Sequence, residues 1–322
     1  MTAVNNVSEM TVFSPGNPTW SSSGLCKPNV ITFSEKFTAY IMAYLSFPVS
    51  VIATFCNTVT LYTIIKSPRL QSSSNALLGV LSATDLLVGI VILPCYMVIC
   101  IHDVTGQSDC TLRLFHGYFS HFLCGFSVFM AAVISLDRCI KVSFPLRCRS
   151  WNLKDAYKVA IFFGMIVLIA IVLLHPFQLI GIGVFNVIAS CFIACILLIP
   201  IISYIIIFII VKKGNRSIVD SQTSFRRLLR RKREARTAKV IGIVILLLFV
   251  CYLPRMFSVL YRDRSTSGGY QVNRWSAFLV FSNAALNPII YWSRMDDFKH
   301  VVSAVLPNIM RLARGYFLSK KK

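Results

Sequence analysis

The chain of 322 residues is 56% hydrophobic and only 14% charged, and its mean hydropathy is +0.69. A water-soluble protein cannot bury so large an apolar fraction, so the composition excludes one and indicates a protein that crosses a membrane several times. The formal net charge of +21 would suit nucleic-acid binding, but the basic residues gather in a few loops and in the tail. We therefore expect contacts with membrane lipids and no nucleic-acid partner.

Residues 1–36 are rich in Ser, Asn, Pro and Thr, which is typical of a disordered, solvated tail. The segment lacks the apolar stretch of a cleavable signal peptide, so the first membrane helix is expected to direct its own insertion. Asn6 begins an Asn-Val-Ser sequon and is a candidate glycosylation site. We therefore predict an extracellular tail over residues 1–36.

Seven apolar segments follow the tail, and each is long enough to cross about 30 Å of hydrocarbon. They lie near residues 37–65, 74–101, 110–142, 156–177, 184–211, 237–261 and 272–293. A shorter amphipathic segment near 296–312 suits a helix in the membrane interface, although Pro307 should interrupt it. The predicted fold is all-α, with a seven-transmembrane helix bundle over 37–294, followed by an interfacial eighth helix and a short cytoplasmic tail over 295–322.

The Lys and Arg residues are distributed very unequally between the two sides of these spans. Twenty-six of the 33 fall on one side, and 11 of those lie between residues 212 and 239. The more positive side of a membrane protein is normally the cytoplasmic side. We therefore expect an extracellular amino terminus and a cytoplasmic carboxyl terminus.

Few polar groups lie inside the predicted spans, and each is a functional candidate because such groups are costly in hydrocarbon. They are a carboxylate, a hydroxyl and three amides: Asp85, Ser127, Asn57, Asn283 and Asn287. Oxygen atoms of these kinds can coordinate a small cation such as sodium. A hydrogen-bonded network with water explains the same residues without an ion, so both interpretations stay open.

The third span ends in a charged pair, Asp137-Arg138, and the chain runs on into Pro145-Leu146. An arginine left in hydrocarbon costs at least a few kcal/mol, so it must pair, face the bundle interior or reach water. Asp137 can hold Arg138, and so can an acid from another helix. An ordinary helix end that carries two charges is the alternative interpretation.

Seven spans with these motifs in this order resemble the rhodopsin-like G-protein-coupled receptors, over about residues 37–306. Asp137-Arg138-Cys139 resembles the family's Asp-Arg-Tyr motif, and the segment from Asn287 to Tyr291 matches Asn-Pro-x-x-Tyr in full. The remaining positions match residues of the family's first, second, fifth, sixth and seventh helices, with tyrosine in place of the sixth-helix tryptophan: Asn57, Asp85, Pro200, Cys251, Tyr252, Pro254 and Pro288.

The resemblance implies a plasma-membrane receptor that catalyses no covalent chemistry of its own. An extracellular ligand would shift the bundle to a state that promotes nucleotide exchange on a heterotrimeric G protein. In the inactive state Arg138 would be restrained by Asp137 and by Glu234 of the sixth helix. On activation that helix would swing outward about Pro254, and Arg138 would contact the Gα subunit.

Further roles follow from the resemblance alone. Leu146, after Pro145, would insert into an apolar pocket of the G protein, and Tyr291 would rotate inward in the active state. The residues implied to hold sodium in the inactive state are Asp85, Ser127, Asn283 and Asn287. No other metal or cofactor is expected. Phe281 stands where opsins carry the retinal-linking lysine, so retinal is excluded.

The chain also departs from the family pattern at several positions. Arg113 stands where the family's third-helix cysteine is expected, and the second outer loop, near 177–185, contains no cysteine. Cys26 and Cys110 are the candidates for an alternative extracellular disulfide. Ser120 stands where amine receptors carry an aspartate, which does not favour a monoamine ligand. The substitutions at Cys139 and Tyr252 leave the ease of coupling and activation open.

The helix register places a candidate ligand pocket among the third, fifth, sixth and seventh spans. Its predicted lining is Tyr96, Ser120, His121, Cys124, Phe192, Ile196, Arg255, Met256, Ala277 and Phe281. Arg255 would meet a carboxylate or phosphate of an acidic small molecule, lipid or peptide. Alternatively, Arg255 reaches the outer water or pairs with Asp263 or Asp103.

Other classes of membrane protein remain as alternatives. A small transporter or channel could use Asp85, Asn283 and Asn287 as an ion path, but the halves of the sequence show no convincing internal repeat. A membrane enzyme would need a convergent acid, base and nucleophile or a set of metal ligands, and no such set is visible. A weakly coupling decoy or accessory receptor is the alternative within the receptor class.

Overall fold

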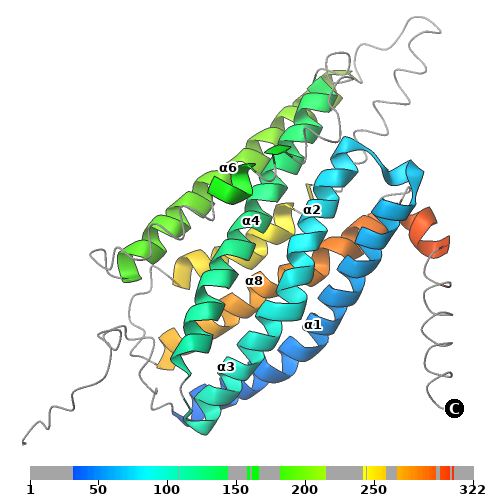
Figure 1. Ribbon diagram of the computed structural model, residues 1–322. Coiled ribbons are helices and arrows are strands. Elements are labelled where there is room, and N and C mark those ends of the chain that lie inside the picture. Colours follow the sequence, from blue (N-terminus) through cyan, green and yellow to red (C-terminus); the bar gives the residue numbers. More distant parts are fainter. Residues whose placement is uncertain are drawn as a thin grey trace, which may run out of the picture.

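The computed structural model describes residues 32–107, 109–143, 158–159, 162–166, 182–214, 242–243, 245–258, 267–294, 298–304 and 307. All regular structure within these residues is helical, and Figure 1 shows the long helices side by side in one bundle. The predicted amino-terminal tail, the carboxyl-terminal tail and most of the fourth span and of the basic segment before the sixth span lie outside the described residues.

The helices agree with the predicted spans to within several residues at most ends. The elements are α1 (Phe33–Lys66), the 3₁₀ turn η2 (Pro68–Leu70), α2 (Ser73–Leu87), the π-helical turn η3 (Val88–Ile92), α3 (Leu93–Thr105), α4 (Cys110–Ser143), α6 (Ile182–Gly214) and α8 (Ser267–Arg294). Four described helices have the length and hydropathy to cross a membrane: Phe33–Lys66, Ser74–Thr105, Cys110–Ser143 and Ser190–Ile210. A shorter apolar helix, Ile245–Ser258, lies in the sixth span.

Local sequence signals explain where two of these helices begin and end. Thr32 and Glu35 form a capping box at the start of α1, in which the Glu35 carboxylate accepts a hydrogen bond from the Thr32 amide at 2.7 Å. At the other end of the second span, Gly106 adopts a left-handed conformation with φ of 73° directly after Thr105. Glycine tolerates that conformation without steric cost, so the chain turns there towards α4.

The second span is one continuous rod that α2, η3 and α3 form together. The π turn Val88–Ile92 lies between Asp85 and Pro94, where the missing proline N–H removes one α-helical hydrogen bond. One extra residue in a turn rotates all following side chains by about 100°. The π turn therefore sets which face of α3 points into the bundle.

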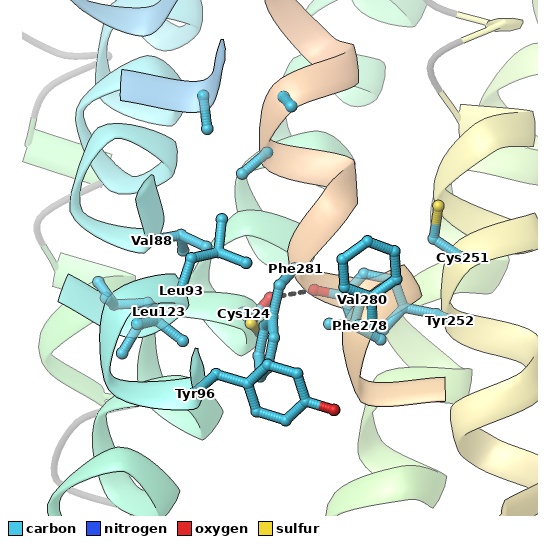
Figure 2. Close-up of a cluster of buried hydrophobic side chains, with 14 of the residues drawn as sticks. Val88, Leu93, Tyr96, Leu123, Cys124, Cys251, Tyr252, Phe278, Val280 and Phe281 are labelled. Carbon is cyan, nitrogen blue, oxygen red and sulfur yellow. Dashed lines mark hydrogen bonds between the residues drawn. The ribbon is translucent and has the colours of Figure 1, made fainter. Parts of the chain in front are cut away.

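The bundle is packed from two buried groups of apolar side chains. Helix α1 packs against α3 and α8, α4 packs against α6, and α2 packs against both α1 and α4. The outer group includes Tyr96, Tyr252 and Phe281, which Figure 2 shows in close-up, and the inner group includes Met130 and Tyr291. Helix faces directed away from the bundle carry exposed aliphatic and aromatic side chains, as suits surfaces that contact lipid.

Candidate functional site

A polar network lies at the centre of the bundle, around the Asp85 carboxylate of α2. Asp85 is only 1% exposed. Ser127 of α4 donates a hydrogen bond of 3.0 Å to its Oδ1, and Asn287 of α8 donates one of 2.9 Å to its Oδ2. The structure therefore brings together three of the five polar residues predicted from the sequence and joins three helices through a single carboxylate.

The other two predicted amides are Asn57, which bonds to α8, and Asn283, which lies in α8. Asn57 of α1 donates hydrogen bonds of 2.9 Å to the backbone oxygens of Ala53 and Ala284, so it ties α1 to α8. Asn283 lies one turn before Asn287 on α8, and both are buried. Asn57 and Asn283 thus extend the polar region beyond the residues that bond directly to Asp85.

Several oxygen atoms of this region are buried without a hydrogen-bond partner among the described residues. They are Oδ1 of Asn57, Asn283 and Asn287 and Oγ of Ser82. Buried polar atoms normally have a partner, because an unsatisfied one costs about 1–3 kcal/mol. The region therefore has the donor set, a carboxylate with hydroxyl and amide oxygens, for ordered water or for a small hard cation.

At the inner end of α4, the Asp137 carboxylate is held by Lys141 and Ser74. Lys141, one turn further along α4, places Nζ 2.8 Å from Oδ1 and 3.1 Å from Oδ2. Ser74 of α2 donates a second hydrogen bond to Oδ2. Both oxygens of this carboxylate therefore have partners that the sequence did not suggest, and the restraint of Arg138 by Asp137 stays a prediction.

The remaining predicted coupling residues can be placed only in part. Arg138 has a buried Nε, and Cys139 packs beside Ile207 of α6. Tyr291 is buried, with its ring centroid 6.4 Å from that of Phe298. Glu234, Pro145 and Leu146 lie outside the described residues.

The sixth helix is linked to α4 through the residue that replaces the expected tryptophan. Tyr252 is 3% exposed, and its hydroxyl donates a hydrogen bond of 2.9 Å to the backbone oxygen of Cys124. Figure 2 shows this bond as a dashed line between Tyr252 and Cys124. Pro254 follows within the same helix, and Pro200 and Pro288 lie inside α6 and α8. The predicted switch residues therefore lie within helices, and Tyr252 connects two of them.

The outer half of the bundle contains most of the predicted pocket. The buried members are Tyr96, Ser120, Cys124, Ile196 and Phe281. The partly buried members are His121, Arg255, Met256 and Ala277. These side chains are at least partly shielded from the surroundings of the bundle, as the lining of a pocket requires.

Phe192, the remaining member of the predicted lining, is not shielded in this way. Its side chain is 56% exposed, and the adjacent Ile193 packs against the core instead. Successive helix positions differ by about 100°, so Phe192 and Ile193 point in different directions. The role of Phe192 in the pocket stays a prediction.

Arg255 of the sixth helix bonds to a neutral side chain of α8. Its Nη1 donates to the Asn273 amide oxygen of α8. Asp103 instead binds Arg113 of α4 and Arg274 of α8, and Asp263 lies outside the described residues. The sequence did not predict that Asp103, Arg113 and Arg274 form one ionic cluster. The available signal was that these three charged residues lie near the outer ends of three spans.

The structure supports the disulfide prediction for one of the two cysteines. Cys110, the first residue of α4, is disulfide-bonded. The predicted partner, Cys26, lies outside the described residues, as does Asn6. Eight of the described cysteines are free thiols: Cys56, Cys95, Cys100, Cys124, Cys139, Cys191, Cys195 and Cys251.

Comparison with known proteins finds similarity along most of the chain. The family model described as 7 transmembrane receptor (rhodopsin family) matches residues 56–186 and 179–291. Trace amine-associated receptor 13c of Danio rerio is 25% identical over 304 residues, which cover 85% of this chain and 86% of the relative. Trace amine-associated receptor 6 of Rattus norvegicus is 27% identical over 299 residues, covering 80% and 82%.

Proposed function

Because the chain belongs to the rhodopsin family of seven-transmembrane receptors and is a cell-surface G-protein-coupled receptor, we propose how its bundle signals. An extracellular ligand shifts the bundle to a state that promotes nucleotide exchange on a heterotrimeric G protein. The amino terminus lies outside the cell and the carboxyl terminus inside, in accordance with the Lys and Arg distribution. The family is one of receptors and not of enzymes.

The observation that carries this proposal is the set of single hydrogen bonds between helices at mid-bundle. The hydroxyl of Tyr252 joins the sixth helix to α4, and Asp85 joins α2 to α4 and α8. Each bond links helices that must shift relative to one another when the inner face opens. A ligand that favours a different arrangement of these helices therefore has a two-state element on which to act.

At the inner face, Arg138 is proposed to make the contact with the Gα subunit. It lies at the inner end of α4, directly after an acid whose charge is already matched by Lys141. Its release from Glu234, when the sixth helix moves about Pro254, is the proposed coupling step. Pro145 and Leu146 are proposed to contact the same G protein, and Tyr291 to support the active arrangement.

The central polar network is proposed to hold a sodium ion in the inactive state. Asp85 supplies the charge, and Ser127, Asn283 and Asn287 supply neutral oxygen atoms. Two of these amides have a buried oxygen without a hydrogen-bond partner among the described residues. A bound cation would stabilise the arrangement in which those oxygens converge.

The ligand is proposed to be acidic, although the relatives are named for trace amines. Ser120 stands at the position where amine receptors carry an aspartate, and it donates its hydroxyl to the backbone oxygen of Gly117 at 3.1 Å. The sixth helix contributes a cation to this region, Arg255, instead. The charge of the region thus favours a carboxylate or phosphate over an ammonium group.

Complex formation with a G protein tests the proposed coupling. The purified receptor in lipid nanodiscs would be mixed with heterotrimeric G proteins of each Gα class, and nucleotide would then be removed enzymatically. We expect a complex with at least one heterotrimer that dissociates when a non-hydrolysable GTP analogue is added. Arg138→Ala should abolish that complex, whereas the exposed Lys36→Gln should retain it. A complex that survives the GTP analogue, or none with any heterotrimer, would contradict the proposal.

A further inference from the structure

A buried ionic cluster lies at the outer ends of α3, α4 and α8, apart from the residues that the proposed function uses. Asp103, near the end of α3, is 3% exposed. It accepts hydrogen bonds from Arg113 Nη2 at 2.6 Å, from the Tyr270 hydroxyl at 2.8 Å and from Arg274 Nη2. One carboxylate therefore faces two guanidinium groups, whose side chains are only 12% and 11% exposed.

The cluster holds one more positive charge than negative charge. Among the described residues, Asp103 is the acid to which Arg113 and Arg274 are bonded. A net charge with little contact to water is costly, and a further anion would reduce that cost. The charge balance therefore favours binding of an anion at these arginines.

Two polar atoms next to the surplus charge are buried without a hydrogen-bond partner among the described residues. They are Nε of Arg274 and Nε2 of His116. Because buried donors and acceptors are normally satisfied, such atoms call for a partner. The planar guanidinium group presents paired N–H donors that fit a carboxylate or a phosphate. Arg274 thus has both the charge and an unused donor for a second anion.

An aromatic surface adjoins the same arginine. The rings of Tyr96, His116 and Phe281 contact one another, with centroid separations of 5.8 Å, 5.3 Å and 5.5 Å. Figure 2 shows Tyr96 beside Phe281. The Arg274 guanidinium carbon lies 5.8 Å from the Tyr96 ring centroid, and the Tyr96 hydroxyl donates to the Arg274 backbone oxygen at 2.8 Å. The Arg274 guanidinium group therefore lies next to this aromatic surface.

We propose that this cluster is the subsite for the acidic head of the extracellular ligand. Arg274, held by Tyr96 and only partly neutralised by Asp103, binds a carboxylate or phosphate. An aromatic or apolar ligand body lies against the group Tyr96, His116 and Phe281. The inference rests on the proposed receptor function and specifies its ligand. It also assigns Asp103 as a residue that weakens ligand binding, because its carboxylate neutralises part of the guanidinium charge and competes with the ligand anion for Arg274. Arg113 acts on the ligand only through this carboxylate.

The test compares probes that share a phenyl group and differ in charge. The purified receptor in nanodiscs would be titrated with 3-phenylpropionate, phenyl phosphate, 3-phenylpropionamide and 2-phenylethylamine while its melting temperature is followed. We expect a saturable rise with the carboxylate or the phosphate, and the larger rise identifies the preferred head group. The neutral amide and the amine should have no such effect. A rise with the amine, or none with either anion, would overturn the proposal.

Variants test whether the anion acts at this cluster. Arg274→Gln should remove the anion-dependent rise. Asp103→Asn removes the carboxylate that competes with the probe and should tighten the apparent affinity about tenfold, because it deletes a like charge close to the bound anion. The exposed cation Lys36 lies at the outer end of α1, and Lys36→Gln should leave the affinity unchanged. Weaker anion binding by Asp103→Asn, with Arg274→Gln like the wild type, would overturn the assignment.

Failure of this inference is distinguishable from failure of the proposed function. The melting-temperature assay contains no G protein, so it reports only on the outer subsite. A receptor that forms a nucleotide-sensitive G-protein complex but shows no anion effect would support the proposed function and contradict the proposed subsite. A receptor that binds the anion but forms a complex with no heterotrimer would support the proposed subsite and contradict the proposed coupling.

Discussion

At the scale of single residues, Tyr252 shows how a departure from the family pattern is accommodated. A tryptophan is expected at this position, and its indole could only donate through a ring N–H. The tyrosine hydroxyl instead reaches the backbone oxygen of Cys124, 2.9 Å away on α4. The substitution therefore adds a specific link between the sixth helix and α4, and we propose that this link stabilises the inactive arrangement.

Tyr252→Phe should raise basal nucleotide exchange several-fold. The change removes only the hydroxyl, so it deletes the bond to Cys124 at a cost of about 1 kcal/mol to the inactive state. Nucleotide exchange by the reconstituted receptor without ligand measures the effect. Tyr62→Phe, at an exposed tyrosine of α1, is the matched control and should not change the rate. Basal exchange at or below the wild-type rate in Tyr252→Phe would show that the bond does not restrain the receptor.

Lys141 is a second residue whose role the sequence did not suggest. Its ammonium group binds both oxygens of Asp137, one turn earlier on the same helix. Lys141→Met should lower basal and ligand-driven exchange, because the buried carboxylate of Asp137 then turns to Arg138 for its counter-ion. Lys141→Arg preserves the charge and should restore exchange. Equal exchange by wild type and Lys141→Met would exclude this role.

At the scale of helices, the second span depends on the contact of η3 with α1. A Cβ placed on Gly89 would lie 2.8 Å from Thr54 Oγ1 and 2.9 Å from the Thr54 backbone nitrogen. The Ser50 hydroxyl donates to the Gly89 backbone oxygen at 2.7 Å. Small residues permit this close approach of two membrane helices. The contact fixes the π turn, and hence the direction of Tyr96 and Asp103.

Gly89→Ala should destabilise the receptor by about 1–3 kcal/mol, because the added methyl group meets backbone as well as side-chain atoms. Gly79→Ala is the control: its nearest neighbour would be the flexible Ile64 side chain at 3.6 Å. Alanine is favoured over glycine inside a helix by about 0.5–1 kcal/mol, so this change should be neutral or stabilising. Thermal unfolding in nanodiscs compares the two. A Gly89→Ala receptor as stable as Gly79→Ala would disprove the close contact.

The polar network is also a property of several helices together. Sodium should raise the melting temperature of the wild-type receptor relative to an equal concentration of choline, because the ion is proposed to bind the folded bundle. Asp85→Asn removes the charge and should abolish the difference. Ser127→Ala should weaken it. A sodium effect of the same size in Asp85→Asn would place the ion elsewhere.

At the scale of the whole molecule, hydropathy and charge predicted the helical bundle, because each span must satisfy its backbone within itself. The central polar residues could be predicted in the same way, since Asp85, Ser127 and Asn287 stand out in apolar segments. The π turn could not, because Val88–Ile92 is apolar throughout. The outer cluster of Asp103 and Arg274 could not be predicted either, because it forms only where the ends of α3 and α8, far apart in the sequence, lie close together.

The central claim is that ligand-dependent movement of this bundle activates a G protein through Arg138. The most direct measurement is the rate of nucleotide exchange on purified Gα proteins, by wild type and Arg138→Ala receptors in nanodiscs, with and without the acidic probe that stabilises the wild type best. We expect wild type to accelerate exchange on at least one Gα, the probe to change that rate, and Arg138→Ala to return it to the receptor-free rate. Equal exchange by both receptors, or none by wild type with the bound probe, would contradict the claim.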